Sequence, residues 1–308
     1  MQRKLVGVLC TYRRPEAAIH FLDVLEAQDR PPDLVVVVDN GHDDDERLRV
    51  QTEQDRWSFT TRYRSPGANL GPAGAFALAH GELAGELGPE DLVLHLDDDD
   101  PPPQAGLLGQ LLAALERAAQ ADPRVAGIGL SGGRLGPRTG LIAPVTGTPA
   151  LEPVDHLHGG YLPVYRFRAI DSVGGADRTF FYGFEELELG RRLTLNGWRL
   201  LVHNELMGEV RDRYPKRAPR SRRLTSIADP EADWSRFHKE RNLIRILRRE
   251  RRWGAIASTV LVRHLARPLI AAVRQPRPAA HRIRLGLRAT VAGLRGAGGI
   301  DPRYPPPA

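Results

Sequence analysis

The sequence predicts an α/β protein with a doubly wound, mostly parallel sheet and helices on both faces, followed by a C-terminal helical extension. Short apolar segments alternate with amphipathic segments through the first half of the chain. Residues 34–38 are five consecutive apolar residues, the pattern of a strand buried on both faces of a parallel sheet. The connections between these segments are short, as βαβ units require.

The individual elements follow from apolar spacing. Strands are predicted over residues 5–10, 34–38, 59–63, 92–96 and 200–203. Helices are predicted over residues 15–28, 72–87, 104–121 and 180–196, and then over 236–252, 253–272 and 281–294. Residues 127–163, rich in Gly, Pro and Thr, are predicted to form extended hairpins, and residues 211–233 an irregular loop.

Charge is divided unevenly along the 308 residues. Residues 1–210 hold 20 Lys and Arg against 31 Asp and Glu, a net charge of −11, whereas residues 211–308 hold 24 against 7, a net charge of +17. We therefore predict an α/β domain over residues 1–233 and a basic helical extension over residues 234–308. A basic extension suits an anionic membrane surface or a nucleic acid. Because the extension lacks a recognisable nucleic-acid module, we expect the membrane and no nucleic acid.

Residues 253–272 are apolar enough to raise the question of a membrane span. Arg263, His264 and Arg267 fall inside this segment, where charges are costly in a bilayer. Two alternatives remain: a helix lying in the membrane interface, and a helix packed on the α/β domain. A single cysteine, Cys10, and a start without a secretory pattern predict a cytoplasmic protein, free or peripheral at the inner face of the plasma membrane.

Four aspartates, residues 97–100, directly follow the apolar run 92–96. Like charges gathered at the end of a buried strand repel one another, and a divalent cation offsets that repulsion. Carboxylates suit Mg²⁺ or Mn²⁺, which also bind phosphates. Asp97 and Asp99 can face the same ion, since alternate residues of an extended segment point the same way. Asp98 then faces the other way, toward a sugar or ribose, and Asp100 is a cap. The alternative is a solvated acidic loop.

Six segments at the ends of successive elements carry further chemistry. They are residues 6–15 (VGVLCTYRRP), 35–41 (VVVVDNG), 69–76 (NLGPAGAF), 97–99 (DDD) and 184–192 (FEELELGRR), followed by Arg241-Asn242. In this order they resemble the family-2 glycosyltransferases of the GT-A fold, and the aspartates match that family's DxD element. The resemblance covers residues 5 to about 245 and looks closest to actinobacterial galactofuranosyl- and rhamnosyltransferases.

The resemblance implies a metal-dependent, inverting hexosyltransferase. The donor would be a nucleotide sugar of the UDP-galactofuranose or dTDP-rhamnose type, and the acceptor a glycan, lipid-linked or small-molecule hydroxyl. Residues 1–233 would then be the catalytic domain. The donor side is assigned to residues in three turns and in the aspartate run: Thr11, Arg13, Asp39, Asn69, Gly71, Gly74 and Asp98.

Several of these donor-side residues also have structural explanations. Asp39 can accept a hydrogen bond from the ring imide of uracil or thymine, or it can cap the next turn. Gly71 and Gly74 can let the backbone approach the donor, or they can belong to an ordinary helix entry.

Glu185 and Glu186 are predicted to lie on the acceptor side. The resemblance places the general base at Glu186, which would take the proton of the attacking hydroxyl, and acceptor contacts at Glu185. The alternative is a pair of carboxylates stabilised at a helix N-terminus. The aromatic residues 180–184 in front of the pair look like a wall for sugar stacking, which favours catalysis.

The chain departs from the family pattern at one metal ligand. The family usually carries a histidine about thirteen residues beyond the glycine that matches Gly197. Here the sequence reads Gly208-Glu209-Val210, and His203 falls earlier, in a predicted strand. Either Glu209 replaces the histidine, or His203 reaches the ion, or the site has fewer protein ligands.

Two other functions are compatible with parts of the sequence. A sugar nucleotidyltransferase also uses a metal on an α/β sheet, but it would favour a glycine-rich first loop, and residues 7–14 lack those glycines. A nucleic-acid-binding protein would use the Arg-rich extension but would leave Asp97, Asp99 and Glu186 unexplained.

Overall fold

The computed structural model describes residues 3–42, 44–99, 101–102, 105–145, 147, 149–159, 162–213, 233–273 and 276–307. Contacts divide the chain into two compact units. The first contains Met1–Arg134, Pro144–Arg178 and Glu186–Arg217. The second contains Leu135–Ala143, Thr179–Glu185 and Ala218–Ala308. The predicted boundary at residue 233 thus separates the C-terminal helices, but the second unit also includes two short segments from the middle of the chain. Most of the predicted irregular loop lies outside the described residues.

Strands and helices alternate through residue 121, as predicted. The elements are β1 (Leu5–Thr11), α1 (Pro15–Glu26), β2 (Leu34–Asp39), α2 (Asp44–Thr52), η1 (Gln54–Arg56), β3 (Thr60–Arg64), α3 (Gly71–Leu83), β4 (Leu92–Asp97) and α4 (Leu107–Ala121). The sequence analysis missed α2. Its nine residues include only two large apolar side chains, Leu48 and Val50, so it has no amphipathic stripe to detect.

The following residues contribute shorter elements. They are β5 (Val125–Gly129), β6 (Gly132–Leu135), β7 (Ile142–Pro144), β8 (Leu151–Val154), β9 (His156–Leu157), β10 (Val164–Arg166), α5 (Phe167–Ser172), η2 (Arg178–Phe180), α6 (Glu185–Leu195), β11 (Arg199–His203) and α7 (Asn204–Arg213). Residues 127–163 are largely extended, as predicted, and β6 pairs antiparallel with β9. However, β5 and β8 are strands of the main sheet and not separate hairpins.

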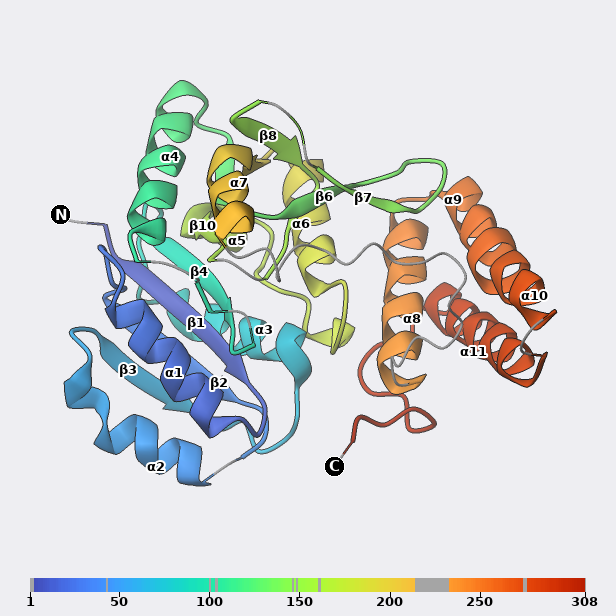
Figure 1. Ribbon diagram of the computed structural model, residues 1–308, viewed down its shortest axis with the longest axis horizontal. Helices are drawn as coiled ribbons and strands as arrows, with labels where there is room; N and C mark the ends of the chain where they lie inside the picture. Colours follow the sequence, from blue (N-terminus) through green and yellow to red (C-terminus); the bar gives the residue numbers. More distant parts are fainter. Residues whose placement is uncertain are drawn as a thin grey trace. The chain divides into compact units, whose positions relative to one another are not determined.

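The main sheet has eight strands in the order β3-β2-β1-β4-β10-β5-β11-β8 (Figure 1). Strands β1, β2, β3 and β4 are parallel to one another, and β11 is parallel to β5. Only β10 and β8 run antiparallel to the strands beside them. The prediction of a doubly wound, mostly parallel sheet is therefore confirmed, with two antiparallel strands that the sequence analysis did not anticipate.

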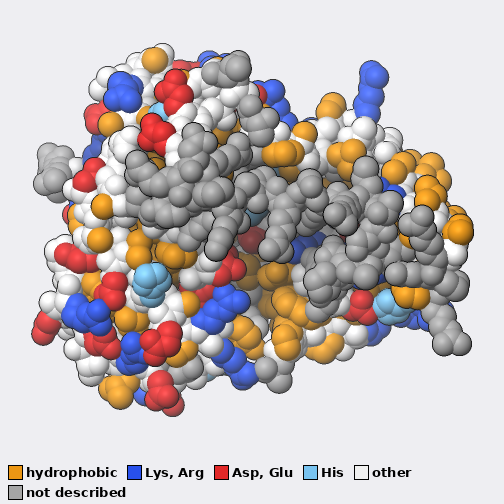
Figure 2. Space-filling model, viewed as in Figure 1, with side chains coloured by type: hydrophobic (Ala, Val, Ile, Leu, Met, Phe, Trp, Pro, Cys, Tyr) orange, Lys and Arg blue, Asp and Glu red, His pale blue; other side chains and the backbone are white. Residues whose placement is uncertain are grey.

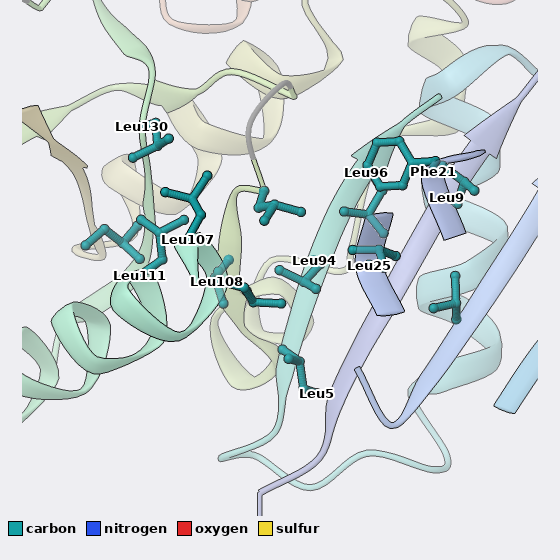
Figure 3. Close-up of a cluster of buried hydrophobic side chains, with 14 of the residues drawn as sticks. Leu5, Leu9, Phe21, Leu25, Leu94, Leu96, Leu107, Leu108, Leu111 and Leu130 are labelled. Atoms are coloured by element: carbon teal, nitrogen blue, oxygen red, sulfur yellow. The ribbon is translucent and has the colours of Figure 1, made fainter. Parts of the chain in front are cut away.

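Alternation along the central strands builds a core on each face of the sheet. On one face Leu5 and Leu9 of β1 lie in a cluster with Phe21 of α1 and Leu108 of α4, as Figure 3 shows. On the other face Val6 and Val8 belong to a cluster with α3 and α6. Since successive strand residues point to opposite faces, β1 is apolar on both sides. Helices thus cover both faces.

The carboxyl ends of β1, β2 and β4 are level. Thr11 at the end of β1 pairs with Asp39 at the end of β2, and Cys10 pairs with Asp97 at the end of β4. The chain winds from β1 outward to β3 and then returns to place β4 on the other side of β1. Ligands of open α/β sheets bind at such a reversal, outside the carboxyl ends of the strands.

The second unit contains the C-terminal helices: α8 (Asp233–Arg249), α9 (Trp253–Ser258), the π-helical segment η4 (Thr259–Ala266), α10 (Arg267–Ala272) and α11 (Pro276–Leu294). The helices predicted over residues 236–294 are therefore confirmed. Phe237 of α8 packs with Leu285, Ala289 and Ala292 of α11. Among the described residues, one helix, Trp253–Ala272, is long and apolar enough to cross a membrane, with 28% of its most apolar stretch buried.

Candidate active site

The side chains of the aspartate run at the end of β4 differ in their exposure to solvent. Asp97 and Asp99 are exposed, whereas the side chain of Asp98 is only 5% exposed. Thr11 Oγ1 donates a hydrogen bond to Asp98 Oδ2 over 2.9 Å, and Arg14 Nη1 donates to Asp98 Oδ1 over 3.2 Å. Asp98 thus joins the ends of β4 and β1, and its contact with a donor stays a prediction. Asp100 lies outside the described residues.

Negative charge accumulates around Asp97. Loss of hydration raises the pKa of Asp97 to about 7, and the charges of Asp99, Asp98 and Glu186 add to this rise, while Arg14 opposes it. A divalent cation relieves repulsion of this kind. Mg²⁺ typically takes one or two protein carboxylates together with substrate phosphates. Asp97 and Asp99 therefore fit the protein's share of a Mg²⁺ or Mn²⁺ site.

Among the described residues, no third metal ligand lies near Asp97 and Asp99. Within the part of the chain that the structure describes, no three His, Cys, Asp or Glu side chains gather closely enough to hold a metal ion. His203 ends β11, and its Nδ1 accepts a hydrogen bond of 3.5 Å from the backbone N–H of Leu206 in α7. Glu209 lies exposed on α7. The structure thus does not bring His203 or Glu209 together with the aspartates, and their metal roles stay predictions.

Asp39 is fully buried at the end of β2. Its Oδ1 accepts a hydrogen bond from the Gly41 N–H over 2.6 Å, and its Oδ2 accepts one from the Tyr63 hydroxyl over 2.6 Å. The capping alternative is therefore realised, with an additional link to β3. Contact with a nucleotide base stays a prediction. A Cβ on Gly41 would lie 2.6 Å from the backbone N of Arg13, so this turn needs a glycine.

Arg13 and Thr11 occupy the turn that follows β1. Arg13 is exposed and has a positive φ of 55°, and its guanidinium lies 5.5 Å from the ring centroid of Tyr12. Thr11 is buried against Asp98. The turn therefore presents the Arg13 side chain to solvent at the level of the strand ends, which is compatible with the predicted donor contact.

The glycines of the segment 69–76 have specific structural reasons. Gly71 begins α3 with a positive φ of 64°, a conformation that favours glycine, and its N–H donates to Asn69 Oδ1 over 2.9 Å. A Cβ on Gly74 would overlap the Cβ of Leu70. Both glycines are thus needed for this helix entry, whether or not a donor lies against it.

Asn40 is a site residue that the sequence analysis quoted but gave no role. Its Oδ1 accepts a hydrogen bond from the Leu70 N–H over 2.9 Å, and its Nδ2 donates to the Gly71 carbonyl over 3.4 Å and to Cys10 Sγ over 3.3 Å. One buried amide therefore connects the ends of β1 and β2 to the start of α3. The available signal was a polar residue directly after the buried strand 34–38.

Two buried histidines lie behind the site. His80 of α3 and His95 of β4 face each other with 2.9 Å between their Nε2 atoms, and the His95 ring lies between Phe76 and Tyr165. The Ala176 N–H donates to His80 Nδ1, so His80 carries its proton on Nε2 and donates it to His95. Burial, with a smaller effect of Arg192, lowers the pKa of His80 to about 4. Both rings are therefore neutral at physiological pH.

We expect this pair to destabilise the protein in mild acid. Between pH 6.5 and 4 the unfolded chain binds a proton at His80 that the folded protein does not, so the free energy of unfolding falls as pH decreases. The loss from His80 should reach about 3 kcal/mol at pH 4. Urea unfolding of wild type and His80→Leu from pH 7 to 4.5 should show a shallower decline in the variant. The exposed His20→Asn serves as the control, and equal slopes for all three proteins would contradict the assignment.

Glu186, the predicted acceptor-side carboxylate, lies in the first unit. It is half-buried on the first turn of α6 and accepts a hydrogen bond from the Gly159 N–H. Loss of hydration raises its pKa, while His158 and the Gly159 N–H act in the opposite direction. A Cβ on Gly159 would overlap Glu186 Oε1. His158 and Gly159 were missed from sequence, because they lie in the segment directly after β9 rather than in a motif.

The loop before Glu185 is held within the second unit. Asn242 Nδ2 donates to the carbonyl oxygens of Phe180 (2.8 Å), Tyr182 (3.0 Å) and Gly183 (2.8 Å). Phe181, Gly183 and Phe184 have positive φ angles. The predicted Arg-Asn element is therefore a clamp on the predicted aromatic segment, and the conformation that it holds is one that side chains rarely adopt.

Two aromatic residues of that segment do not form the expected sugar-stacking wall. Phe180 and Phe181 are buried, and the Arg245 guanidinium lies 4.2 Å from the Phe180 ring centroid. Tyr182 is half-buried, with its ring 4.7 Å from that of Trp234. The prediction of an exposed wall is thus wrong for Phe180 and Phe181, which instead pack inside their own unit.

Comparison with known proteins finds related glycosyltransferases. No family model matches the chain. The chain is 32% identical over 211 residues to galactofuranosyltransferase GlfT1 of Mycobacterium tuberculosis, covering 64% of this chain and 66% of that protein. It is 31% identical over 205 residues to GlfT1 of Mycolicibacterium smegmatis, covering 62% and 65%. The chain thus spans just under two thirds of the length of the curated relatives it matches.

Solved structures support the GT-A fold predicted for this chain. Mannosyltransferase PcManGT from Pyrobaculum calidifontis, in complex with GDP-Man and Mn²⁺, superposes with a TM-score of 0.54 at 17% identity and covers 97% of this chain and 77% of its own. GalNAc-T7 with UDP, GalNAc and Mn²⁺ gives a TM-score of 0.50 at 14% identity, over 65% of this chain and 42% of its own. At these identities the likeness shows the fold alone. The predicted fold class is confirmed.

Proposed function

We propose that this glycosyltransferase transfers a galactofuranosyl residue from UDP-galactofuranose to a hydroxyl of a glycan or lipid-linked glycan, with inversion at the anomeric carbon. The observation that carries the proposal is that carboxylates from two different elements lie close enough for their charges to interact. Asp97 ends β4, Asp99 lies in the turn that follows, and the charge of Glu186 on α6 acts on Asp97. The relatives named galactofuranosyltransferase supply the donor class.

Each side of this arrangement has a separate chemical task. On the donor side, Asp97 and Asp99 would hold Mg²⁺ or Mn²⁺, which offsets the charge of the departing diphosphate. On the acceptor side, Glu186 takes the proton from the attacking hydroxyl as its oxygen bonds to the anomeric carbon and the bond to diphosphate breaks. The raised pKa of Glu186 makes it a stronger base than an ordinary exposed carboxylate.

Donor binding tests the proposal directly. We expect UDP-galactofuranose with Mn²⁺ to raise the melting temperature, because a ligand at about 100 times its Kd stabilises the folded state by about 2.7 kcal/mol. UDP-galactopyranose tests whether the protein recognises the sugar, and dTDP-rhamnose tests whether it recognises the base. Omission of Mn²⁺ tests whether donor binding needs the metal. A response to dTDP-rhamnose alone would move the function to rhamnosyl transfer. Turnover of a nucleoside triphosphate with a sugar phosphate would instead indicate a nucleotidyltransferase.

A further inference from the structure

In the helix Trp253–Ala272 of the second unit, several large apolar side chains are exposed while two polar side chains are buried, although Ile256 is buried and Arg267 is exposed. His264 is 3% exposed and Thr259 is also buried. In contrast, Val273 at the end of this helix is 88% exposed and Ile270 is 74% exposed. Four further large apolar residues on this segment are exposed: Trp253, Leu261, Val262 and Leu269. Hydrophobic side chains gather at the right of Figure 2, where Figure 1 places α10. Exposed apolar surface of this extent usually marks a binding face.

A buried polar network fixes this orientation of the helix. Glu240 of α8 accepts hydrogen bonds from Arg263 Nε over 2.8 Å and is 3.0 Å from His264 Nε2. His264 Nδ1 lies 3.1 Å from Thr290 Oγ1 of α11, and a Cβ on Gly286 would come within 2.7 Å of the His264 ring. Turning the apolar side inward would leave Glu240 as an unpaired buried charge, which is strongly unfavourable.

The exposed side of α11 carries arginines beside aliphatic residues. Its exposed positions recur at spacings of three and four, so they share one face of the helix. They include Arg284, Leu287, Arg288, Val291 and Leu294, with Arg295 directly after the end of the helix. On a helical projection the arginines form one edge of this face and the aliphatic residues the other. This pattern is typical of a helix that lies at a membrane surface.

A basic pocket of about 220 Å³ opens on this face. Its lining includes His281, Arg284, Arg288, Arg303 and Tyr304. Arg303 is neutralised by Asp301, and His281 is 2.5 Å from Asp233. Considering only the described residues, no carboxylate pairs with Arg284 or Arg288, and Arg288 Nη1 donates only to the Tyr304 hydroxyl over 3.3 Å. Two guanidinium groups are therefore available to a phosphate, which they bind in bidentate geometry.

We propose that the exposed apolar residues of Trp253–Val273 and the outer face of α11 form a docking face for an anionic lipid bilayer, with a lipid phosphate in the Arg284–Arg288 pocket. Arginines beside exposed aliphatic residues match the anionic headgroups above an acyl layer, and Trp253 suits the interface. A second copy of the chain would bring like-charged arginine edges together in a symmetric contact. A membrane span is disfavoured because Arg263 and His264 are bound to Glu240.

Vesicle sedimentation of the full chain tests this proposal. We expect binding to vesicles of phosphatidylcholine with 30% phosphatidylglycerol, weak binding to pure phosphatidylcholine, and loss of binding at high salt. Arg284→Glu with Arg288→Glu should reduce the partition coefficient at least about tenfold. Ile270→Glu with Val273→Glu should reduce it similarly. Arg47→Glu and Leu195→Glu, at exposed positions of the first unit, should bind like wild type.

Contrary results would identify another occupant. Absence of vesicle binding, or equal binding by both paired variants and wild type, would overturn the proposal. Stabilisation by millimolar inorganic phosphate that needs Arg284 and Arg288, without vesicle binding, would assign the pocket to a free phosphate. A dimer in light scattering that Ile270→Glu abolishes would assign the face to a second copy. Because binding is measured without turnover, these results are independent of the proposed sugar transfer.

Discussion

Asp97→Asn should reduce the rate of sugar transfer about 10³-fold, since a metal ion supplies several kcal/mol of charge stabilisation at a departing diphosphate. The substitution preserves the size of the side chain at the end of β4 but removes the negative charge that a cation needs. Asp99→Asn should have an effect of similar direction. Calorimetric titration should show that both variants lose the Mn²⁺-dependent part of donor affinity, whether or not acceptor is present.

A matched control variant tests whether the effect depends on where the carboxylate is removed. Asp55→Asn removes an exposed carboxylate from the same unit and should retain wild-type donor affinity and rate. If Asp97→Asn bound the donor with unchanged affinity and unchanged dependence on Mn²⁺, the assignment of the metal to this strand end would be wrong.

Glu186→Gln should retain donor binding and lose transfer by a factor of about 10²–10⁴, the usual contribution of a general base. Glutamine can still accept the hydrogen bond from the Gly159 N–H, so the local structure should persist. Because the base acts as a carboxylate and its pKa is raised, kcat/KM of the wild type should increase with pH through a value above the ordinary range of glutamate. That acidic limb should disappear in the residual activity of the variant.

Glu185→Gln is the comparison for this prediction. It precedes Glu186 on the same helix turn, and we expect a change mainly in the KM for the acceptor. If Glu185→Gln stopped transfer while Glu186→Gln remained active, the base would be Glu185. If neither change affected turnover, the acidic pair would serve only the helix N-terminus.

The parts of the fold that the sequence could predict are those with a clear apolar pattern. The strand over residues 34–38 is detectable as an unbroken apolar run, and helix α4 is detectable from apolar residues at helical spacing. Helix α2 and the two antiparallel strands β8 and β10 were not predicted. Short or polar elements of this kind depend on partners distant in the chain. Strand pairing across the sheet cannot be inferred from local periodicity.

The site followed a similar division. Asp97, Asp99 and Glu186 could be proposed as site residues from the sequence because they stand in motifs at the ends of elements. Asn40, His158 and the His80–His95 pair were not, because their roles arise only when separate segments meet. Phe180 was misread for the same reason: an aromatic residue beside acidic ones suggests sugar stacking, yet its ring is covered by Arg245 of its own unit.

The Asn242 clamp also sets an order of events during synthesis of the chain. The carbonyl oxygen of Phe180 accepts a hydrogen bond from Asn242, which lies 62 residues later in the chain. The carbonyl oxygen of Gly183 accepts one from the same residue, 59 residues later. Strands β1 to β4 and their helices can form as soon as they leave the ribosome, since chains fold from the N-terminus during synthesis. The loop that leads to the acidic pair can reach its native conformation only after α8 has emerged. A nascent chain would therefore form β1 to β4 first and the loop before Glu185 last.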